Sequence, residues 1–377
     1  MYINRAISEQ LKEDLLKDDK VVILYGARQV GKTTLANKIL DELKLKSLRI
    51  NAEEMQYRDV LSSRDLVKLG ALIGDHEILF IDEAQYIEQV GFNLKLIHDH
   101  IPNVKVLVTG SSAFDLANKL SEPLTGRSWK HTLYPISYTE LAKDKTDFEL
   151  ARELEERLVY GAYPDLISMQ AYQKKERYLY QLTNAYLFKD IFAFASIKHH
   201  TKIGQLLRLL AFQVGSEVSI NELATQLGIS RAAVNNYIDL LEKSFVIFRL
   251  SGFSRNLRKE VSKMDKIFFF DLGVRNAMIN NFNLLEMRND VGQLWENFLI
   301  TERLKKNSYS QHYCNSYFWR LHSGAELDYV EEYGGKVHGY EYKWGRKKSS
   351  APTSWVKEYT NSTFELINRE NFLDFVV

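Results

Sequence analysis

Over the first 150 residues, apolar runs alternate with segments of helical periodicity. The runs at 78–81 and 104–108 are largely apolar, as in strands that are buried on both faces of a parallel sheet. Helical spacing of apolar residues covers 6–20, the stretch after the apolar run at 21–25, and the stretch between the runs at 47–51 and 78–81. The alternation predicts an α/β fold with a doubly wound parallel sheet, whose strands lie at 21–25, 47–51, 78–83 and 104–112.

A helix pair is predicted in the middle of the chain. Ser219 and Glu222 have the spacing of a capping box, Gly228 ends the first helix, and Ser230 caps the second. Two short helices joined by a glycine-containing turn form a helix-turn-helix. Because an alternating apolar strand follows at 245–250, we expect a winged helix.

The last part of the chain reads as a second α/β region. A buried strand is predicted near 268–271, then a helix, and then strands at 317–320, 325–330 and 337–344. Helices are also expected through 172–191, after a turn at which Pro164 prevents continuation of the preceding helix. We therefore expect four parts: a parallel-sheet α/β domain at 1–150, a helical lid or linker at 151–200, a winged helix-turn-helix at 201–255 and a second α/β domain at 256–377.

Composition narrows the class of protein. With 377 residues, 45% hydrophobic and 26% charged, the chain is typical of a globular protein of two to four domains. A net charge of +1 means that a nucleic-acid partner would have to bind a local basic patch. Cys314 has no partner for an internal disulfide, and no apolar run approaches a membrane span. With no signal-peptide core at the N-terminus, we expect a cytoplasmic protein.

A phosphate-binding loop is predicted directly after the first strand. The sequence 26–33 fits G-x-x-x-x-G-K-[ST], with a strand before it and a helix after it. Glycines let backbone N–H groups approach phosphate oxygens, and the helix N-terminus favours the anion. We expect Lys32 to reach the β- and γ-phosphates and Thr33 to ligate Mg²⁺. The nucleotide-binding residues would be Gly26, Ala27, Arg28, Gln29, Val30, Gly31, Lys32, Thr33, Thr34 and Asp82.

Acidic and hydroxylated residues end the next two buried strands. Asp82 is expected to hold Mg²⁺, and Glu83 to polarise the attacking water as a general base. Thr109, Ser111 or Ser112 could sense the γ-phosphate, and strand-end capping is the alternative. Other candidate residues for the phosphates are Arg28, inside the loop, and Arg127, which could neutralise charge on the γ-phosphate or simply be a surface arginine.

These segments together resemble one branch of the AAA-type ATPases. The resemblance is carried by residues 26–35, 80–85, 109–112 and 124–127. In that branch, bacterial and archaeal proteins join such an ATPase to a C-terminal domain of unknown function. The resemblance covers most of the chain and implies ATP as the nucleotide. A Gly-Tyr-Pro-like element of the branch is present here with Ala162 inserted after Gly161.

The predicted C-terminal strands place acids beside a lysine. Alternation puts Glu341 and Lys343 on one face, and Asp328 on the neighbouring strand could meet Glu341 across the sheet. Two carboxylates can hold Mg²⁺ and a lysine can stabilise developing charge during phosphodiester hydrolysis. This arrangement resembles the PD-(D/E)XK nuclease superfamily, the restriction-endonuclease-like α/β fold, in which Glu296 would match the accessory acid. Ordinary salt bridges are the alternative, and Trp344 replaces the small polar residue that is commoner after the lysine.

DNA contacts are a further expectation. The second helix of the pair would present Arg231, Asn235, Asn236 and Tyr237, and a basic cluster at 255–266 could follow a phosphate backbone. We therefore expect an ATP-hydrolysing protein whose nucleotide state switches a winged-helix and nuclease-like module on DNA. The alternative is a signalling or regulatory ATPase whose C-terminal modules are catalytically inactive and bind protein. A third reading, a ring-forming assembly ATPase, would need Arg127 to act across a subunit boundary. The basic cluster comprises Arg255, Arg258, Lys259, Lys263 and Lys266.

Overall fold

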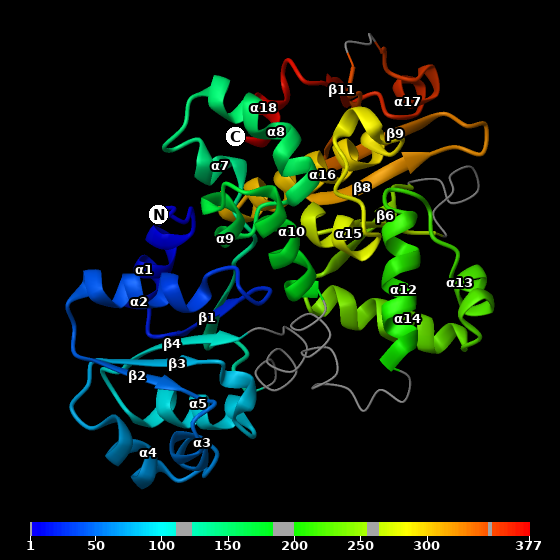
Figure 1. Ribbon diagram of the computed structural model, residues 1–377. Helices are drawn as coiled ribbons and strands as arrows, with labels where there is room; N and C mark the ends of the chain where they lie inside the picture. Colours follow the sequence, from blue (N-terminus) through cyan, green and yellow to red (C-terminus); the bar gives the residue numbers. More distant parts are fainter. Residues whose placement is uncertain (1, 111–122, 184–199, 255–263, 346–348) are drawn as a thin grey trace. The chain divides into compact units, whose positions relative to one another are not determined.

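The computed structural model describes residues 2–110, 123–183, 200–254, 264–345 and 349–377 (Figure 1). The chain forms two compact units. The first contains Met1–Pro135, and the second contains most of the chain from Ile136 to Val377. Ser111 and Ser112, together with 255–263 of the basic cluster, lie outside the described residues.

The first unit is built on a parallel sheet, as predicted, but the sheet has five strands rather than the four expected. Its strand order is β2-β3-β4-β1-β5, and each neighbouring pair is parallel. The strands are β1 (Val21–Tyr25), β2 (Ser47–Asn51), β3 (Ile78–Asp82), β4 (Lys105–Gly110) and β5 (Ser128–Thr132). The helices are α1 (Ser8–Lys17), α2 (Lys32–Leu43), α3 (Met55–Leu61), α4 (Leu66–Ile73) and α5 (Val90–His100), with a 3-10 turn η1 at Ala84–Tyr86.

The inner strands β1 and β3, which lie on either side of the central strand β4, are buried along their full length. On one face of the sheet, Ile23, Ile81 and Val108 pack in a single core with Leu69, Leu94 and other apolar residues of the surrounding helices. Burial of this apolar area from water drives the layered arrangement of sheet and helices. The carboxyl ends of β1, β3 and β4 therefore lie together at one edge of a rigid sheet.

The second unit begins earlier than the predicted boundary at 150. Ser137 caps α7 (Tyr138–Leu141) through a capping box with Glu140, and the ring of Tyr138 packs edge-on against Phe298 at a centroid distance of 5.0 Å. These contacts attach residues 136–150 to the C-terminal part of the chain, so the division between the units falls after Pro135.

A six-stranded mixed sheet forms the centre of the second unit. Its order is β11-β10-β9-β8-β6-β7, in which β6 pairs antiparallel with β7 and parallel with β8. The strands are β6 (Ile247–Gly252), β7 (Lys266–Phe269), β8 (Asn315–Arg320), β9 (Glu326–Tyr333), β10 (Lys336–Tyr342) and β11 (Ser362–Ile367). The expected boundary at 255 therefore falls between two strands of one sheet.

Helices precede, interrupt and follow the strands of this sheet along the chain. The helix pair expected from residue 219 is present as α13 and α14, with Gly228 at φ 64° between them. Of the helices predicted through 172–191, residues 172–181 form α10, and 184–191 lie outside the described residues; Pro164 is the first residue of α9. The helices are α8 (Asp147–Tyr160), α9 (Pro164–Ser168), α10 (Tyr172–Gln181), α12 (His200–Phe212), α13 (Ile220–Leu227), α14 (Arg231–Lys243), α15 (Leu272–Met278), α16 (Val291–Tyr309), α17 (Thr353–Glu358) and α18 (Phe372–Val376), with η3 at Leu285–Met287.

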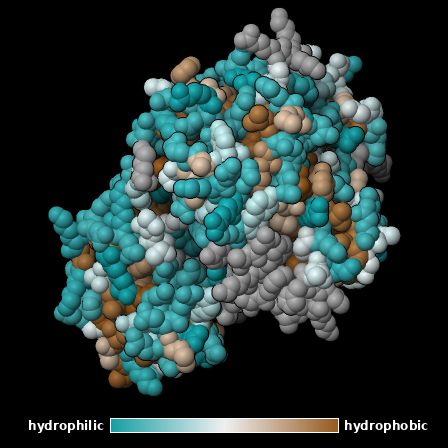
Figure 2. Space-filling view, in the orientation of Figure 1, coloured by the Kyte–Doolittle hydropathy of each residue, from teal (hydrophilic) through white to brown (hydrophobic). Residues whose placement is uncertain are grey.

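The visible surface is mainly polar. On the face drawn in Figure 2, hydrophilic residues predominate and apolar side chains are scattered, with a group over α3 and α4 at lower left. In that group Met55, Leu66 and Val67 are exposed. Among the described residues, no helix combines the length and apolar character that crossing a membrane requires.

Candidate functional site

The loop after β1 adopts a conformation that requires glycine. Gly26 has φ 151° and Gly31 has φ 95°, both in the region that L side chains rarely adopt. A Cβ on Gly26 would lie 2.3 Å from the backbone oxygen of Leu133, so the loop also passes too close to its neighbour for a side chain. Gly31 is the N-cap of α2, and the helix therefore starts with its N–H groups directed at the loop.

Lys32 is folded over this loop. Its Nζ donates to the backbone oxygens of Gly26 at 3.0 Å and Ala27 at 2.9 Å, and only 5% of the residue is exposed. An ammonium group held in this position places positive charge at the mouth of the loop, where the helix dipole also favours an anion.

Asp82 connects three elements at the edge of the sheet. Thr33 Oγ1 donates to Asp82 Oδ2 at 2.8 Å, and Thr109 Oγ1 donates to Asp82 Oδ1. Because β4 lies between β1 and β3, these two bonds bridge the loop helix α2, β3 and β4. Mg²⁺ prefers hard oxygen ligands, and the Thr33 hydroxyl and the Asp82 carboxylate lie close enough to bind one ion together. The residues present therefore fit the expected ion. Of the three residues expected to sense the γ-phosphate, Thr109, Ser111 and Ser112, the structure describes Thr109.

Glu83 follows Asp82 in a left-handed conformation at φ 55°. Its backbone N–H donates to Thr109 Oγ1 at 3.3 Å, and its carboxylate accepts a hydrogen bond from Gln85 Nε2. Glu83 is half-buried, whereas Gln85 is buried. The sequence analysis did not single out Gln85, although a polar residue two positions after the acidic pair was a usable signal. Gln85 fixes the orientation of the expected general base.

The two arginine candidates lie in different places. Arg28 lies beside Tyr86, where burial raises the pKa of the phenol and a hydrogen bond from Arg28 opposes that rise. Arg127 Nε donates to Asp99 at 2.9 Å, and its backbone oxygen accepts from Val21 N at 2.9 Å. Val21 starts β1, so Arg127 is at the end of the sheet opposite to the loop. At about 3.3 Å per residue, β1 separates them by roughly 16 Å. The expected role of Arg127 at the γ-phosphate of its own chain is therefore wrong.

A second acidic group lies in the second unit, where the C-terminal expectation placed it. Asp328 on β9 accepts from Tyr342 N at 2.7 Å, and Glu341 Oε1 is 2.5 Å from Lys343 Nζ. Burial, together with the charges of Glu296 and Glu341, raises the pKa of Asp328 to about 7. Partial burial tends to lower the pKa of the Lys343 ammonium group, but the hydrogen bond to Glu341 and the charges of Glu341, Asp328 and Glu326 together raise it. The structure thus brings all four predicted residues into one electrostatic neighbourhood.

Lys266 is an unforeseen member of this group. The sequence analysis placed it in a basic surface cluster, but it is 8% exposed and its Nζ donates to Glu296 Oε1 at 2.9 Å. Burial raises the pKa of Glu296, and the Lys266 charge partly offsets that effect. Lys266 therefore neutralises the acidic group and does not face solvent as a phosphate contact. No local sequence signal indicated this, because its partner lies 30 residues away.

In another set of potential metal ligands, Cys314 and Glu331 already take part in hydrogen bonds. His312, Cys314 and Glu331 have ligand atoms within 4.8 Å of one another. Glu331 is, however, paired with Arg303 at 2.7 Å, and the Asn307 amide donates to both Glu331 Oε1 and Cys314 Sγ. The ligand atoms of Glu331 and Cys314 are thus part of a hydrogen-bond network that stabilises the fold.

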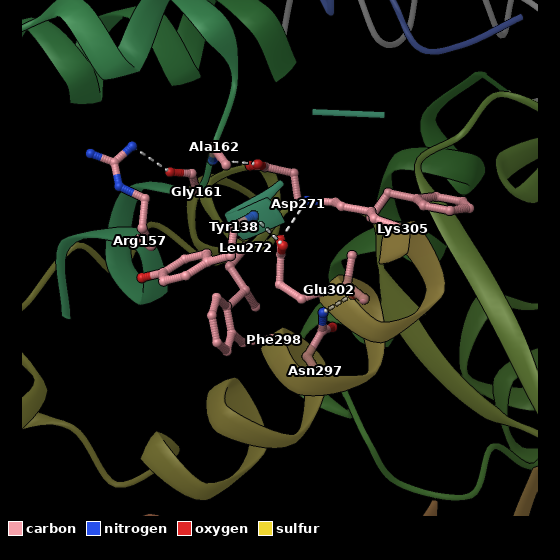
Figure 3. Close-up of a pocket in the computed structure, with 12 residues that line it drawn as sticks. Tyr138, Arg157, Gly161, Ala162, Asp271, Leu272, Asn297, Phe298, Glu302 and Lys305 are labelled. Atoms are coloured by element: carbon pink, nitrogen blue, oxygen red, sulfur yellow. Dashed lines mark hydrogen bonds and ion pairs between the residues drawn. The ribbon is translucent and has the colours of Figure 1, made fainter. Parts of the chain in front are cut away.

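A buried polar cluster between α7, α15 and α16 has a similar structural character (Figure 3). Glu302 accepts from Tyr138 N at 2.7 Å and from Lys305 Nζ at 2.7 Å, and Asp271 accepts from Ala162 N at 2.7 Å. Burial raises the pKa of both carboxyl groups. The adjoining cavity of 20 Å³ has room for about one water molecule, so the cluster joins helices and does not hold a ligand.

The helix pair offers few cations. On α14, Arg231, Asn235 and Asn236 are exposed and Tyr237 is half-buried. Arg231 Nη1 donates to Asn221 at 3.1 Å. The described part of this surface is therefore polar with one arginine on the candidate recognition face.

Comparisons with known proteins agree with the geometry of the first unit. The family described as "AAA domain" matches residues 18–142. The match supports an AAA-type ATPase domain in the first unit, and its last residues, 136–142, belong to the second unit. Two families described as domains of unknown function, DUF8612 and DUF4143, match residues 151–285 and 291–365.

Relatives and a solved structure extend this similarity over more of the chain. The chain is 25% identical to uncharacterized protein MJ1544 of Methanocaldococcus jannaschii, covering 87% of this chain and 74% of that protein. It is also 25% identical to uncharacterized protein Rv2008c of Mycobacterium tuberculosis, covering 91% and 74%. The Walker-type ATPase paby2304 of Pyrococcus abyssi superimposes with a TM-score of 0.51 at 17% identity, covering 74% of this chain and 96% of that one. At this identity the likeness shows the fold alone.

Proposed function

We propose that this chain is an Mg²⁺-dependent ATPase whose nucleotide state switches a helix-turn-helix and nuclease-like module on DNA. The observation that carries the ATPase is the hydrogen bond of 2.8 Å between Thr33 and Asp82, beside Lys32. It joins the loop that would hold the phosphates to the carboxylate that would hold the metal. Bound Mg²⁺ would neutralise phosphate charge, and Thr33 and Asp82 would hold the ion.

The chain's own residues would perform the remaining steps. The N–H groups of the loop and the Lys32 ammonium would bind the phosphates, and Glu83, oriented by Gln85, would accept a proton from the attacking water. Thr109 would report the state of the site, because its hydroxyl contacts Asp82 and receives the Glu83 N–H.

Phosphate release from ATP tests this assignment. The wild-type chain should hydrolyse ATP only with Mg²⁺, and Lys32→Ala should lose nucleotide binding. Lys38→Ala is the matched control, because Lys38 lies on the same helix with its Nζ on Asn4 rather than on the loop. Thr33→Ser should retain activity, whereas the similarly shaped Thr33→Val should require far more Mg²⁺. If the Lys32→Ala variant bound ATP with wild-type affinity, the assignment of the nucleotide site would be wrong.

Phosphodiester cleavage is a second candidate activity, favoured by the convergence of Glu296, Asp328, Glu341 and Lys343. Asp328 and Glu341 would hold a divalent ion, and Lys343 would stabilise developing negative charge. Cleavage of plasmid and single-stranded DNA should disappear in Glu341→Gln. Glu365, on the adjacent strand β11, is exposed, so the Glu365→Gln variant should cleave DNA at the wild-type rate and serves as the control.

The partner of the helix pair needs its own measurement. If DNA is the partner, retention on DNA should weaken with salt and fall when Arg231 and Asn235 are both changed to Ala. DNA-independent ATPase activity, with no retention at low salt and no cleavage, would favour the alternative in which the second unit binds protein and signals nucleotide state.

A further inference from the structure

Arg5 reaches the nucleotide loop from the start of the chain. It precedes α1, is 4% exposed, and belongs to the same unit as the loop. Its Nη1 donates to the backbone oxygen of Val30 at 2.6 Å, and its Nη2 donates to that of Tyr134 at 2.5 Å. One planar guanidinium thus connects the N-terminal segment, the loop and the segment after β5.

The bond to Val30 determines the direction of a loop N–H. In a trans peptide unit the C=O and N–H bonds point in opposite directions. Since the Val30 oxygen is held by Arg5, the N–H of Gly31 in the same peptide points away from Arg5. Gly31 is the N-cap of α2, and its N–H belongs to the group that would face the phosphates.

The bond to Tyr134 supports the loop at its other end. Leu133 N donates to the backbone oxygen of Tyr25 at 2.8 Å, and the Leu133 oxygen lies where a Cβ of Gly26 would be. The segment 133–134 therefore packs against the first residue of the loop. By joining that segment to Val30, Arg5 holds both ends of the loop in one arrangement.

We propose that Arg5 is a positioning residue of the nucleotide site, which keeps the Gly31 N–H directed at the phosphates. The proposal rests on the ATPase function proposed above. Arg5 acts through the backbone and does not touch the nucleotide. A lysine offers a single ammonium group in place of a planar fork, so it should bridge the two carbonyls only in part.

Steady-state ATP hydrolysis and equilibrium ATP binding by the full chain test the role of Arg5. Hydrogen bonds from a charged donor contribute enough that Arg5→Gln should raise KM and Kd for ATP by about tenfold or more. We expect kcat to stay within about twofold, because a preformed loop binds ground and transition states alike. Arg5→Lys should be intermediate.

Lys38→Gln is the matched control. Lys38 Nζ donates to Asn4 at 2.8 Å and lies 3.8 Å from the centroid of the Tyr2 ring, so the change loosens the same N-terminal segment without altering the loop. Its KM should stay within about twofold of wild type, because the Lys38 ammonium contacts Asn4, Tyr2 and Glu42 rather than the loop.

The outcomes separate a positioning role from a general effect on folding. Partial unfolding lowers the apparent kcat and leaves KM unchanged, because the remaining folded molecules bind normally. A wild-type KM in Arg5→Gln, or in folded Arg5→Lys if the glutamine variant does not fold, overturns the proposal. If the wild-type chain neither binds nor hydrolyses ATP, the proposed function itself fails, which is a different result.

Discussion

Replacement of Gly161 by alanine tests the packing of the second unit. Gly161 follows α8 with φ 74° and ψ −159°, a conformation found almost only in glycine. A Cβ at this position would lie 2.1 Å from Asp271 Oδ1 (Figure 3). Asp271 is buried and accepts hydrogen bonds from Ala162 N at 2.7 Å and Val274 N at 3.1 Å, so its carboxyl group cannot move without loss.

The expected destabilisation has two parts. Holding alanine in this backbone conformation costs about 1–3 kcal/mol. Displacing the buried Asp271 carboxyl group from its two hydrogen bonds costs about 1–3 kcal/mol more. We therefore expect Gly161→Ala to lower the free energy of unfolding of the second unit by about 4 kcal/mol.

Gly228→Ala is the control for backbone conformation alone. Gly228 has φ 64° and ψ 37°, and a Cβ added to it would have no neighbouring atom within 4 Å, so alanine there should cost about 1–2 kcal/mol. Urea unfolding followed by tryptophan fluorescence measures both variants, since four of the five tryptophans, Trp295, Trp319, Trp344 and Trp355, belong to the second unit. Equal destabilisation of the two variants would refute the steric argument.

Three further changes test individual charges. Arg127→Ala should keep the rate of ATP hydrolysis within about twofold of wild type and lower the free energy of unfolding by less than about 1 kcal/mol, because the ion pair with Asp99 is near the surface. A loss of activity seen only at protein concentrations at which the chain self-associates would indicate action across a subunit boundary. Without metal, the wild-type stability should fall between about pH 4 and about pH 7, because the folded pKa of Asp328, about 7, means that the native state binds the proton more tightly than the unfolded state does. Asp328→Asn should remove this fall. Parallel curves of stability against pH for the two proteins would contradict the prediction. Lys266→Met should strengthen Mn²⁺ binding to the acidic group, since Glu296 loses its counter-charge, and unchanged Mn²⁺ affinity would count against its place there.

Strand prediction succeeded where the sequence contains closely spaced apolar residues. The run of β3 is wholly buried and was visible as consecutive apolar residues. The edge strand β5 was missed because its sequence, Ser-Trp-Lys-His-Thr, contains no aliphatic residue, whereas the other edge strand, β2, has Leu48 and Ile50 and was predicted. The position of β5 follows from pairing with β1, which is a tertiary constraint that local periodicity does not contain.

The structure brings together those predicted site residues whose positions follow from local spacing. Lys32 and Thr33 belong to one short motif, and Asp82 ends a recognisable strand. Arg127 was misplaced because its position depends on which end of the sheet the chain has reached, which a nearby glycine does not reveal. Arg5 was not singled out, because its backbone partners lie 25 and 129 residues away.

The six-stranded sheet limits how a nucleotide switch could operate. Strand β6, which follows the helix pair, pairs with β8 at Ser251 and Gly252, and Phe253 N donates to Phe318 O at 2.6 Å. Lys266 on β7 is also bound to Glu296 on α16 at 2.9 Å. Moving the helix pair against the acidic group would break these bonds and leave buried charges without partners, which is costly. We infer that nucleotide binding would move the second unit as a whole, so DNA binding and any cleavage should respond to ATP together.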